Sequence, residues 1–245
     1  MCAQPGTRHG YKTRIVLPTC AIVPAFDAVT TVGGVVDDLR EVLDAPVIVV
    51  DDGSADATGY VAAGHGAHVV HHERNLGKGA AILSGLREAA LQGVRTAVTV
   101  DADGQHPASS ARHALDGSAD PRALVLGVRD LVRDGAPRSN RFGNLTSNFF
   151  LSAFAGRRLL DTQCGLRRYP VAETLALDTR SFGYAFESEV LLRAIAAGLP
   201  LVEVPVRVVY PSEGKSRSHF HNVRDPMRIV AAVARTALEL RFSSR

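Results

Sequence analysis

Short apolar runs alternate with longer amphipathic stretches along this chain. The runs are rich in β-branched residues, as buried strands are. They are "CAIV" (20–23), "VIVV" (47–50), "AHVV" (67–70), "AVTV" (97–100), "ALVLG" (123–127) and "VEVPVRVVY" (202–210). The stretches predict helices over about residues 30–43, 56–64, 77–92, 108–116, 139–155, 185–197 and 225–241. In the third helix, Ile82, Leu86 and Ala89 share one face. The alternation predicts an α/β fold with a mainly parallel, Rossmann-like sheet flanked by helices.

Polar segments follow the first four predicted strands. In chain order they are "PAFDAVT", "DDGSADAT", "HHERNLGKGAA" and "DADGQHP". In parallel sheets of this kind, ligands bind at the edge where the strands end. We therefore expect the functional site at this edge.

The composition is that of a soluble globular protein, with 46% hydrophobic and 22% charged residues in a chain of 245. The 28 Lys and Arg exceed the 25 Asp and Glu by only three, which is too little to predict nucleic-acid binding. Cys2, Cys20 and Cys164 form no CxxC pair, so neither a disulfide framework nor a zinc cage is indicated. We expect a cytoplasmic protein.

The polar residues 1–13 are expected to be disordered, leaving one domain over residues 14–245. Nowhere does the chain reach the roughly 20 consecutive apolar residues that span a bilayer. Any contact with the cell membrane is therefore expected to be peripheral, on its inner face.

Two aspartates, Asp101 and Asp103, stand one residue apart after the fourth strand. They could form a simple turn, or their mutual repulsion could be relieved by a divalent cation. An EF-hand loop would need an acidic twelfth residue, but that position is Arg112. A haloacid dehalogenase would carry D-x-D-G-T/V on its first strand, whereas here Gln105 follows Gly104 on the fourth.

Two further segments could meet a nucleotide. In "NLGKGAAILSG" (75–85), glycines and Lys78 open a helix, which is a natural place for a phosphate, although the Walker A spacing is absent. No G-x-G-x-x-G follows the first strand. Asp51 and Asp52 end the second strand, where they could form a turn or accept hydrogen bonds from a base or ribose.

Seven segments together resemble the family 2 inverting glycosyltransferases, which have the GT-A fold. They are "VPAFD", "IVVDDGSADAT", "NLGKGAA", "VDADGQHP", "GVRD", "DTQCGLRRYP" and "GKSR", within residues 23–217, about four-fifths of the chain. The dolichyl-phosphate mannose synthases and polyprenyl-phosphate glycosyltransferases are the most similar branch. The resemblance implies a single GT-A domain that moves a sugar from a nucleotide-diphosphate sugar, GDP-mannose or UDP-hexose, to a lipid-linked acceptor, above all polyprenyl phosphate.

The resemblance also implies a donor site at the strand ends. Its residues would be Pro24, Ala25, Phe26, Asp51, Asp52, Lys78, Asp101, Ala102, Asp103 and Gln105, with Lys215 and Arg217 of a late loop. Within this set, Asp101, Asp103 and Gln105 would hold Mg²⁺ or Mn²⁺. Such a cation takes oxygen ligands and neutralises the departing diphosphate.

On the acceptor side, the resemblance implies a phosphate site made by Arg129 with Arg138 or Arg141, closed by Gln163 and Gly165. The helix after these arginines carries four phenylalanines, Phe142, Phe149, Phe150 and Phe154. Arginines beside an aromatic helix suit a lipid phosphate. The alternative is a solvated basic loop before an ordinary core helix.

A phosphate acceptor is already anionic and needs no general base. A hydroxyl acceptor would need one, and "YAFESEV" offers Glu187 and Glu189. We count Glu189 with Asp101, Asp103 and Arg129 among the catalytic candidates. Glu189 could instead be a surface i,i+4 ion-pair partner of Arg193, and we favour this structural interpretation.

Two departures from the family pattern leave the donor open. Where the family has the motif V-P-x-Y-N-E, this chain has Phe26 instead of the tyrosine and Ala28 instead of the glutamate. Pro211 stands near the position at which the family has a late arginine. A degenerate, non-catalytic nucleotide-sugar binder is therefore the competing hypothesis.

The last predicted helix begins at Asp225 and Pro226. Its apolar stripe consists of Met227, Val230, Ala234 and Leu238. We expect this stripe to pack on the core, with a membrane surface as the alternative.

Overall fold

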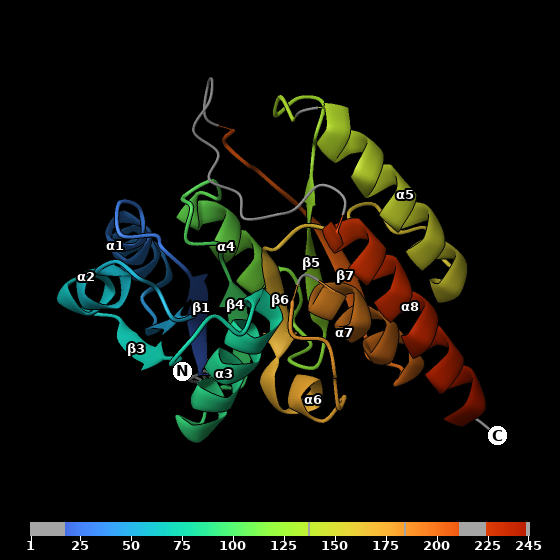
Figure 1. Ribbon diagram of the computed structural model, residues 1–245, viewed down its shortest axis with the longest axis horizontal. Helices are drawn as coiled ribbons and strands as arrows, with labels where there is room; N and C mark the ends of the chain where they lie inside the picture. Colours follow the sequence, from blue (N-terminus) through green and yellow to red (C-terminus); the bar gives the residue numbers. More distant parts are fainter. Residues whose placement is uncertain (1–17, 137, 184, 211–223, 244–245) are drawn as a thin grey trace, which may run out of the picture.

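One seven-stranded sheet organises the protein (Figure 1). The computed structural model describes residues 18–136, 138–183, 185–210 and 224–243. The strands are β1 (Thr19–Ala25), β2 (Val47–Asp51), β3 (His68–His71), β4 (Thr96–Thr99), β5 (Leu124–Arg129), β6 (Arg167–Pro170) and β7 (Leu201–Val206). The helices are α1 (Val32–Leu43), α2 (Thr58–Gly64), α3 (Lys78–Leu91), α4 (Ala108–Asp116), α5 (Arg138–Ala155), α6 (Val171–Leu175), α7 (Ala185–Ala196) and α8 (Arg224–Ser243).

The strand order is β3-β2-β1-β4-β6-β5-β7, and β6 alone runs against its neighbours β4 and β5. The prediction of an α/β protein with a mainly parallel sheet is confirmed. Strand β6 and the short helix α6 were not predicted from the sequence. The last strand was predicted to extend to residue 210, whereas β7 ends at Val206.

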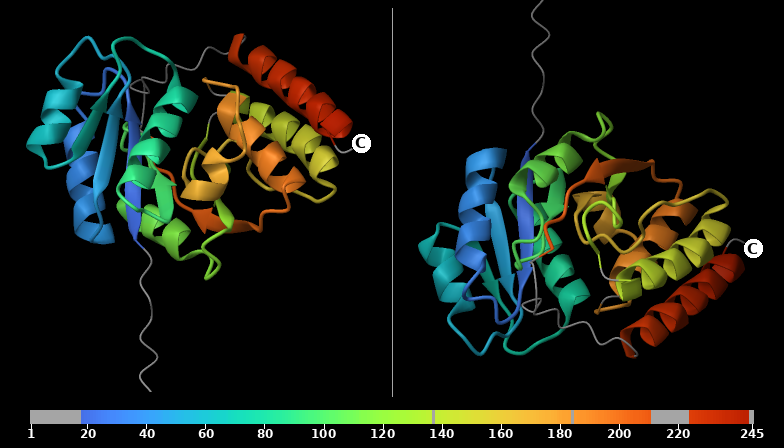
Figure 2. Two further views of the ribbon diagram at one scale, coloured as in Figure 1. Left: turned by 90° about the horizontal axis from the view of Figure 1, so that it is seen from below. Right: turned by 90° about the horizontal axis from the view of Figure 1, so that it is seen from above.

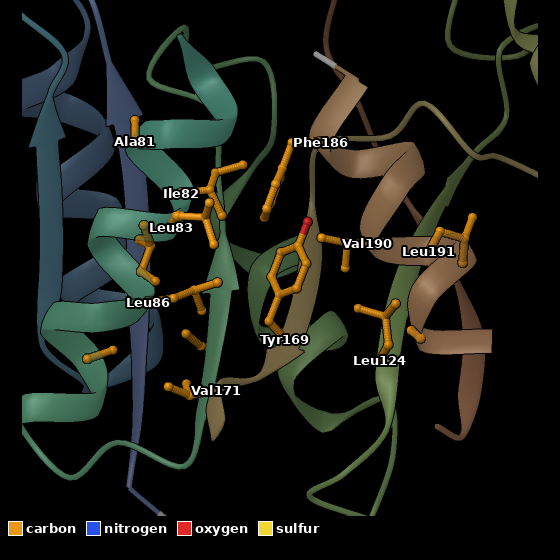
Figure 3. Packing of buried hydrophobic residues seen from close by; sticks show 14 of the residues in the cluster. Ala81, Ile82, Leu83, Leu86, Leu124, Tyr169, Val171, Phe186, Val190 and Leu191 are labelled. Atoms are coloured by element: carbon orange, nitrogen blue, oxygen red, sulfur yellow. The ribbon is translucent and has the colours of Figure 1, made fainter. Parts of the chain in front are cut away.

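Helices cover both faces of the sheet and give it two apolar cores. Helices α1, α2 and α4 supply the core on one face, and α3, α5, α6 and α7 supply the other. Figure 3 shows the second core, where Ile82 and Leu86 of α3 approach Tyr169 and Phe186. The predicted face of α3 is correct, because Ile82, Leu86 and Ala89 are all fully buried.

Helix α8 lies outside α7, farther from the sheet (Figures 1 and 2). Its inward residues are Ala232 and Thr236, both buried, whereas Ala234 and Leu238 are exposed. The prediction that the stripe packs on the core is therefore wrong for Ala234 and Leu238. The side chains of Met227 and Val230 lie outside the part of the chain that the structure describes. Among the described helices, none has the length and apolarity to cross a membrane.

The parallel strands end at one edge of the sheet. This edge brings together Ala25 of β1, Asp51 of β2, Asp101 just beyond β4 and Arg129 of β5. Since β6 is antiparallel, the loop that precedes it, residues 161–166, lies at the same edge. The topology thus gathers segments that are more than a hundred residues apart in the sequence.

Candidate functional site

The loop after β4 presents Asp101 and Asp103 at this edge. The backbone N–H of Val100 donates to the carbonyl of Ile22 at 3.0 Å, which fastens the loop to β1. The N–H of Gln105 donates to Oδ1 of Asp103 at 3.0 Å, and Gly104 adopts a φ of +73° in the same turn. The turn that the sequence predicts is therefore present, and it serves to fix the aspartates.

A lysine lies between two carboxylates at this site. Nζ of Lys78, the first residue of α3, is 2.6 Å from Oδ1 of Asp101 and 3.3 Å from Oε1 of Glu187 on α7. The three groups come from the ends of β4, α3 and α7 and form the centre of the candidate site. Glu187, not Glu189, belongs to it.

Gly165 allows this close approach. A Cβ atom at position 165 would lie 2.6 Å from Nζ of Lys78 and 2.7 Å from Oδ2 of Asp101. Both distances are shorter than a van der Waals contact, so any larger residue would displace the pair. The structure therefore brings Gly165 beside Asp101 and Lys78.

The two aspartates have opposite electrostatic environments. Burial disfavours the charged form of Asp101, but the ammonium of Lys78, with smaller contributions from His106 and Arg129, holds the pKa of Asp101 below its usual value. The pKa of Asp103 is raised. Neighbouring atoms partly shield its carboxyl group from water, although the residue as a whole is exposed, and the negative charge of Asp101 repels a second charge there. Positive charge near Asp103 would be stabilising.

The donor atoms around Asp103 suit a hard cation. The described residues contain no group of three His, Cys, Asp or Glu side chains with metal-binding geometry. Asp101, Asp103 and Gln105 instead offer two carboxylates and one amide oxygen, a partial set that an Mg²⁺ or Mn²⁺ ion completes with water and substrate phosphate oxygens. The repulsion between the aspartates is consistent with such an ion, so the residues fit it.

Asp52 has a structural role in the loop that leads to Lys78. Its carboxylate accepts hydrogen bonds from the N–H groups of Leu76 at 2.9 Å and Gly77 at 2.8 Å, and lies 2.6 Å from Nδ1 of His72. Asp52 is only 3% exposed, and these contacts occupy its carboxylate. It positions the start of α3 from behind the site.

Asp51 is the more available carboxylate of this pair. Its Oδ1 accepts the N–H of Ser54 at 3.0 Å, and its Oδ2 lies 3.4 Å from Nδ1 of the exposed His71. At the end of β1 lie Pro24 and the buried Ala25, and Phe26 follows directly after the strand; Pro24 and Phe26 are half-buried. These four residues lie together at the ends of β1 and β2, as the sequence predicts for one side of a donor pocket.

The loops after β1 and β2 interlock. The N–H of Asp27, a residue with a φ of +47°, donates to Oγ of Ser54 at 3.0 Å, and its carboxylate accepts the N–H of Ala55 at 2.8 Å. The N–H of Ala28 donates to Oγ1 of Thr58 at 2.8 Å. Backbone contacts thus fix the position at which Ala28 replaces the family's glutamate.

Arg129 forms a two-pronged ion pair with Asp161. Its Nε and Nη2 donate to the two carboxylate oxygens at 2.7 and 3.0 Å, and Nδ2 of Asn144 adds a bond of 2.8 Å. The Asp161 side chain is fully buried. Burial opposes its charge, but Arg129 holds the pKa of Asp161 below the usual value and the pKa of Arg129 is raised in turn.

The other residues predicted for the acceptor side, and two predicted for the donor side, are placed unequally. The N–H of Gln163 donates to Asp161 at 3.2 Å, and its side chain faces Gly143 of α5. Arg141 lies half-buried near the start of α5. Arg138 is the first residue of α5 but its side chain is outside the described set, and Lys215 and Arg217 lie outside the described residues altogether.

Glu189 lies in a different environment from Glu187. Its carboxylate accepts hydrogen bonds from the N–H groups of Arg180 at 3.0 Å and Ser181 at 2.8 Å and from Nε of Arg193 at 2.8 Å. It is therefore the predicted i,i+4 partner of Arg193, but in a fully buried position rather than on the surface. These contacts support a structural role.

Sequence reasoning missed two residues of this region, Asp161 and Arg167. The fully buried Arg167 donates to the carbonyls of Thr162, Cys164 and Glu187 at 2.7, 2.9 and 2.6 Å, and so joins the loop before β6 to α7. Both residues lie inside "DTQCGLRRYP", the segment already singled out. Their partners, however, are far away in the sequence or are backbone atoms.

Comparison with known proteins supplies an independent result. Residues 20–169 match the family described as Glycosyl transferase family 2. An uncharacterised protein of Methanocaldococcus jannaschii is 32% identical over 80% of this chain and 83% of its own length. The polyprenol monophosphomannose synthase of Mycolicibacterium smegmatis is also 32% identical, over 76% of this chain and 74% of its own length.

Solved structures show the same fold. The glucosyl-3-phosphoglycerate synthase of Mycobacterium tuberculosis, in complex with Mn²⁺, uridine diphosphate and phosphoglyceric acid, aligns with a TM-score of 0.71. The alignment covers 91% of this chain and 79% of that one, at 20% sequence identity. At this identity the similarity establishes the fold alone.

Proposed function

This chain belongs to glycosyltransferase family 2, and on that premise we propose that it transfers a sugar from a nucleoside-diphosphate sugar to a polyprenyl phosphate. One observation carries the proposal. Arg129 ends β5 and pairs with Asp161, while Gly165 of the same loop lies beside Asp101, so the residues expected to serve the acceptor and the donor lie at one edge of the sheet. The relative named as a polyprenol monophosphomannose synthase supports the same acceptor class.

On the donor side, Asp51 and the end of β1 would bind the nucleoside, and the diphosphate would lie over Asp101 and Asp103. A divalent ion held by Asp101, Asp103 and Gln105 would supply Lewis-acid stabilisation of the leaving diphosphate. The solved relative with Mn²⁺ and uridine diphosphate supports this cofactor class. Lys78, at the N-terminus of α3, would direct its ammonium and the helix dipole toward the same phosphates.

On the acceptor side, Asp161 holds the guanidinium of Arg129 by its Nε and Nη2 edge. The remaining nitrogen, Nη1, is the donor that we assign to the acceptor phosphate. A phosphate oxygen then forms a bond to the anomeric carbon while the bond from that carbon to the diphosphate oxygen breaks, and the nucleoside diphosphate leaves. Because the phosphate is already ionised, the step requires no proton transfer. The engagement of both Glu187 and Glu189 in other contacts agrees with this.

The acceptor class can be tested by offering phosphate and hydroxyl versions of one lipid. The protein is incubated with Mn²⁺, a panel of GDP- and UDP-sugars, and either polyprenyl phosphate or the parent polyprenol, and the products are identified by mass spectrometry. We expect a glycosylated polyprenyl phosphate and no glycosylated polyprenol. Glycosylation of hydroxyl acceptors alone would contradict the proposal and would favour Glu187 or Glu189 as a general base.

A further inference from the structure

Helix α5 exposes a continuous apolar face. Leu145 and Phe149 are each 69% exposed, Phe150 is 55% exposed and Phe154 is 36% exposed. Phe149 and Phe150 are in edge-to-face contact, with ring centroids 5.5 Å apart. No charged residue occurs between Gly143 and Ala155 in the sequence. The outward face of this helix therefore lacks the charges that keep most surface helices in water.

The opposite face of α5 fixes this orientation. Leu151 is buried in the core, and Nδ2 of Asn148 donates to the carbonyl of Leu160 at 2.6 Å. Nδ2 of Asn144 donates to Asp161. Because these contacts hold the inner face, the helix cannot rotate to hide its aromatic residues. Figure 1 shows α5 at the outer margin of the molecule, and both views of Figure 2 show α8 beside it.

The charge around this face is positive at both ends. Arg141 precedes it, and the exposed Arg157 and Arg158 follow it. Glu203, 3.5 Å from Arg157, offsets part of the charge at the second end. A second copy of the chain would bring like charges together, whereas anionic lipid headgroups complement them.

We propose that α5 docks the protein on an anionic bilayer, with Leu145, Phe149, Phe150 and Phe154 inserted at the headgroup boundary. This inference deepens the proposed function and rests on it for its purpose. Asn144, in the first half of α5, shares Asp161 with Arg129. Docking through α5 thus brings the acceptor side of the site to the level at which a lipid phosphate lies.

The surface can be tested without donor, metal or acceptor. The full chain is sedimented with vesicles of phosphatidylcholine alone or of phosphatidylcholine with phosphatidylglycerol. Leu145→Glu and Phe149→Glu are compared with Leu91→Glu, a matched change at an 83% exposed leucine at the far end of α3. We expect binding to the anionic vesicles, weakened about tenfold or more by each α5 change and unaltered by Leu91→Glu, because each α5 change removes a large apolar side chain from the inserted face. Thermal melting of each variant verifies its fold.

Three results would overturn the inference. Equal losses in Leu145→Glu and Leu91→Glu would show a non-specific effect. No binding to the phosphatidylglycerol vesicles, but binding when polyprenyl phosphate is added to them as a separate arm, would assign the face to the acceptor chain rather than to the bilayer. A dimer that Leu145→Glu dissociates would assign it to a second copy. If vesicle binding maps to α5 while transfer to lipid phosphates fails, the proposed function falls and the docking surface stands.

Discussion

Nζ of Lys78 lies 2.6 Å from Oδ1 of Asp101, a carboxylate that we assign to a divalent cation. Two cations cannot share this oxygen closely without repulsion. Lys78 therefore acts as a counter-ion that a metal must displace or move aside. Glu187 lies 3.3 Å from the same ammonium and can keep Lys78 paired when a metal binds Asp101.

Replacing Lys78 with methionine should strengthen metal binding in the absence of donor. The variant removes the competing charge and keeps much of the side-chain volume, so we expect the Mn²⁺ dissociation constant to fall about threefold to tenfold, the equivalent of an ion pair of about 1 kcal/mol. Titration calorimetry measures this directly. Lys78→Arg keeps the charge and is the control, and weaker Mn²⁺ binding by Lys78→Met would show that Lys78 supports the metal site instead of competing with it.

Gly165→Ala should reduce activity without unfolding the protein. The added Cβ would meet both Lys78 and Asp101 and move them apart. A displacement of reacting groups by about 1 Å can cost about a hundredfold in rate, so we expect kcat/KM for sugar transfer to fall by about that factor. Gly34→Ala is the control, because nothing lies within 4 Å of a Cβ atom there. Full activity of Gly165→Ala would mean that this close approach is not used.

Asp161→Asn should destabilise the fold, because it leaves the Arg129 guanidinium without its counter-charge. Removing one partner of a buried ion pair costs about 3–5 kcal/mol, and urea unfolding at neutral pH measures the loss. Since the folded pKa of Asp161 is lowered, its contribution is fully present above the unfolded pKa of about 3.9 and is lost as the pH falls through the folded value. The stability difference between wild type and variant should therefore shrink in acid, and a difference independent of pH would exclude this cause.

Glu189→Gln and Glu187→Gln should separate a structural carboxylate from a site carboxylate. Glu189 holds Arg180, Ser181 and Arg193, so its variant should melt at a lower temperature but keep at least about a tenth of the transfer rate, as expected where no general acid–base contribution of about 10²–10⁴ is lost. Glu187→Gln should reduce transfer more, because it loosens Lys78. A thousandfold loss in Glu189→Gln alone would point to a hydroxyl acceptor.

The sequence predicted the elements that carry strong periodicity. The helix at 108–116 has the predicted bounds, and six of the seven strands lie on the apolar runs. Strand β6 was missed because it reads "RRYP", two arginines and a proline. Arg168 is nonetheless buried, since backbone carbonyls such as those of Leu115 and Ser118 accept its guanidinium protons. Such compensation depends on the tertiary fold and leaves no local pattern.

The candidate site shows the same division. Residues that directly follow strands, such as Asp51 and Asp101, could be placed from the sequence because parallel strands end at one edge. The distinct roles of Asp51 and Asp52 could not, because the loop that occupies Asp52 comes from residues 72–77. The partners of Arg129 and Lys78 likewise come from distant segments. Sequence motifs therefore predicted the candidate site, and only the structure showed which charged groups in it face each other.

The proposed sugar transfer depends on a donor diphosphate held over Asp101 and Asp103 by a metal. The most direct measurement is calorimetric binding of GDP and UDP, with Mn²⁺ and with a chelator, to the wild type and to Asp103→Asn. We predict Mn²⁺-dependent binding of one nucleotide to the wild type and its loss in Asp103→Asn by about a hundredfold or more, in line with roughly 3 kcal/mol for one electrostatic contact. Equal affinity in the two proteins with Mn²⁺ present would contradict the account.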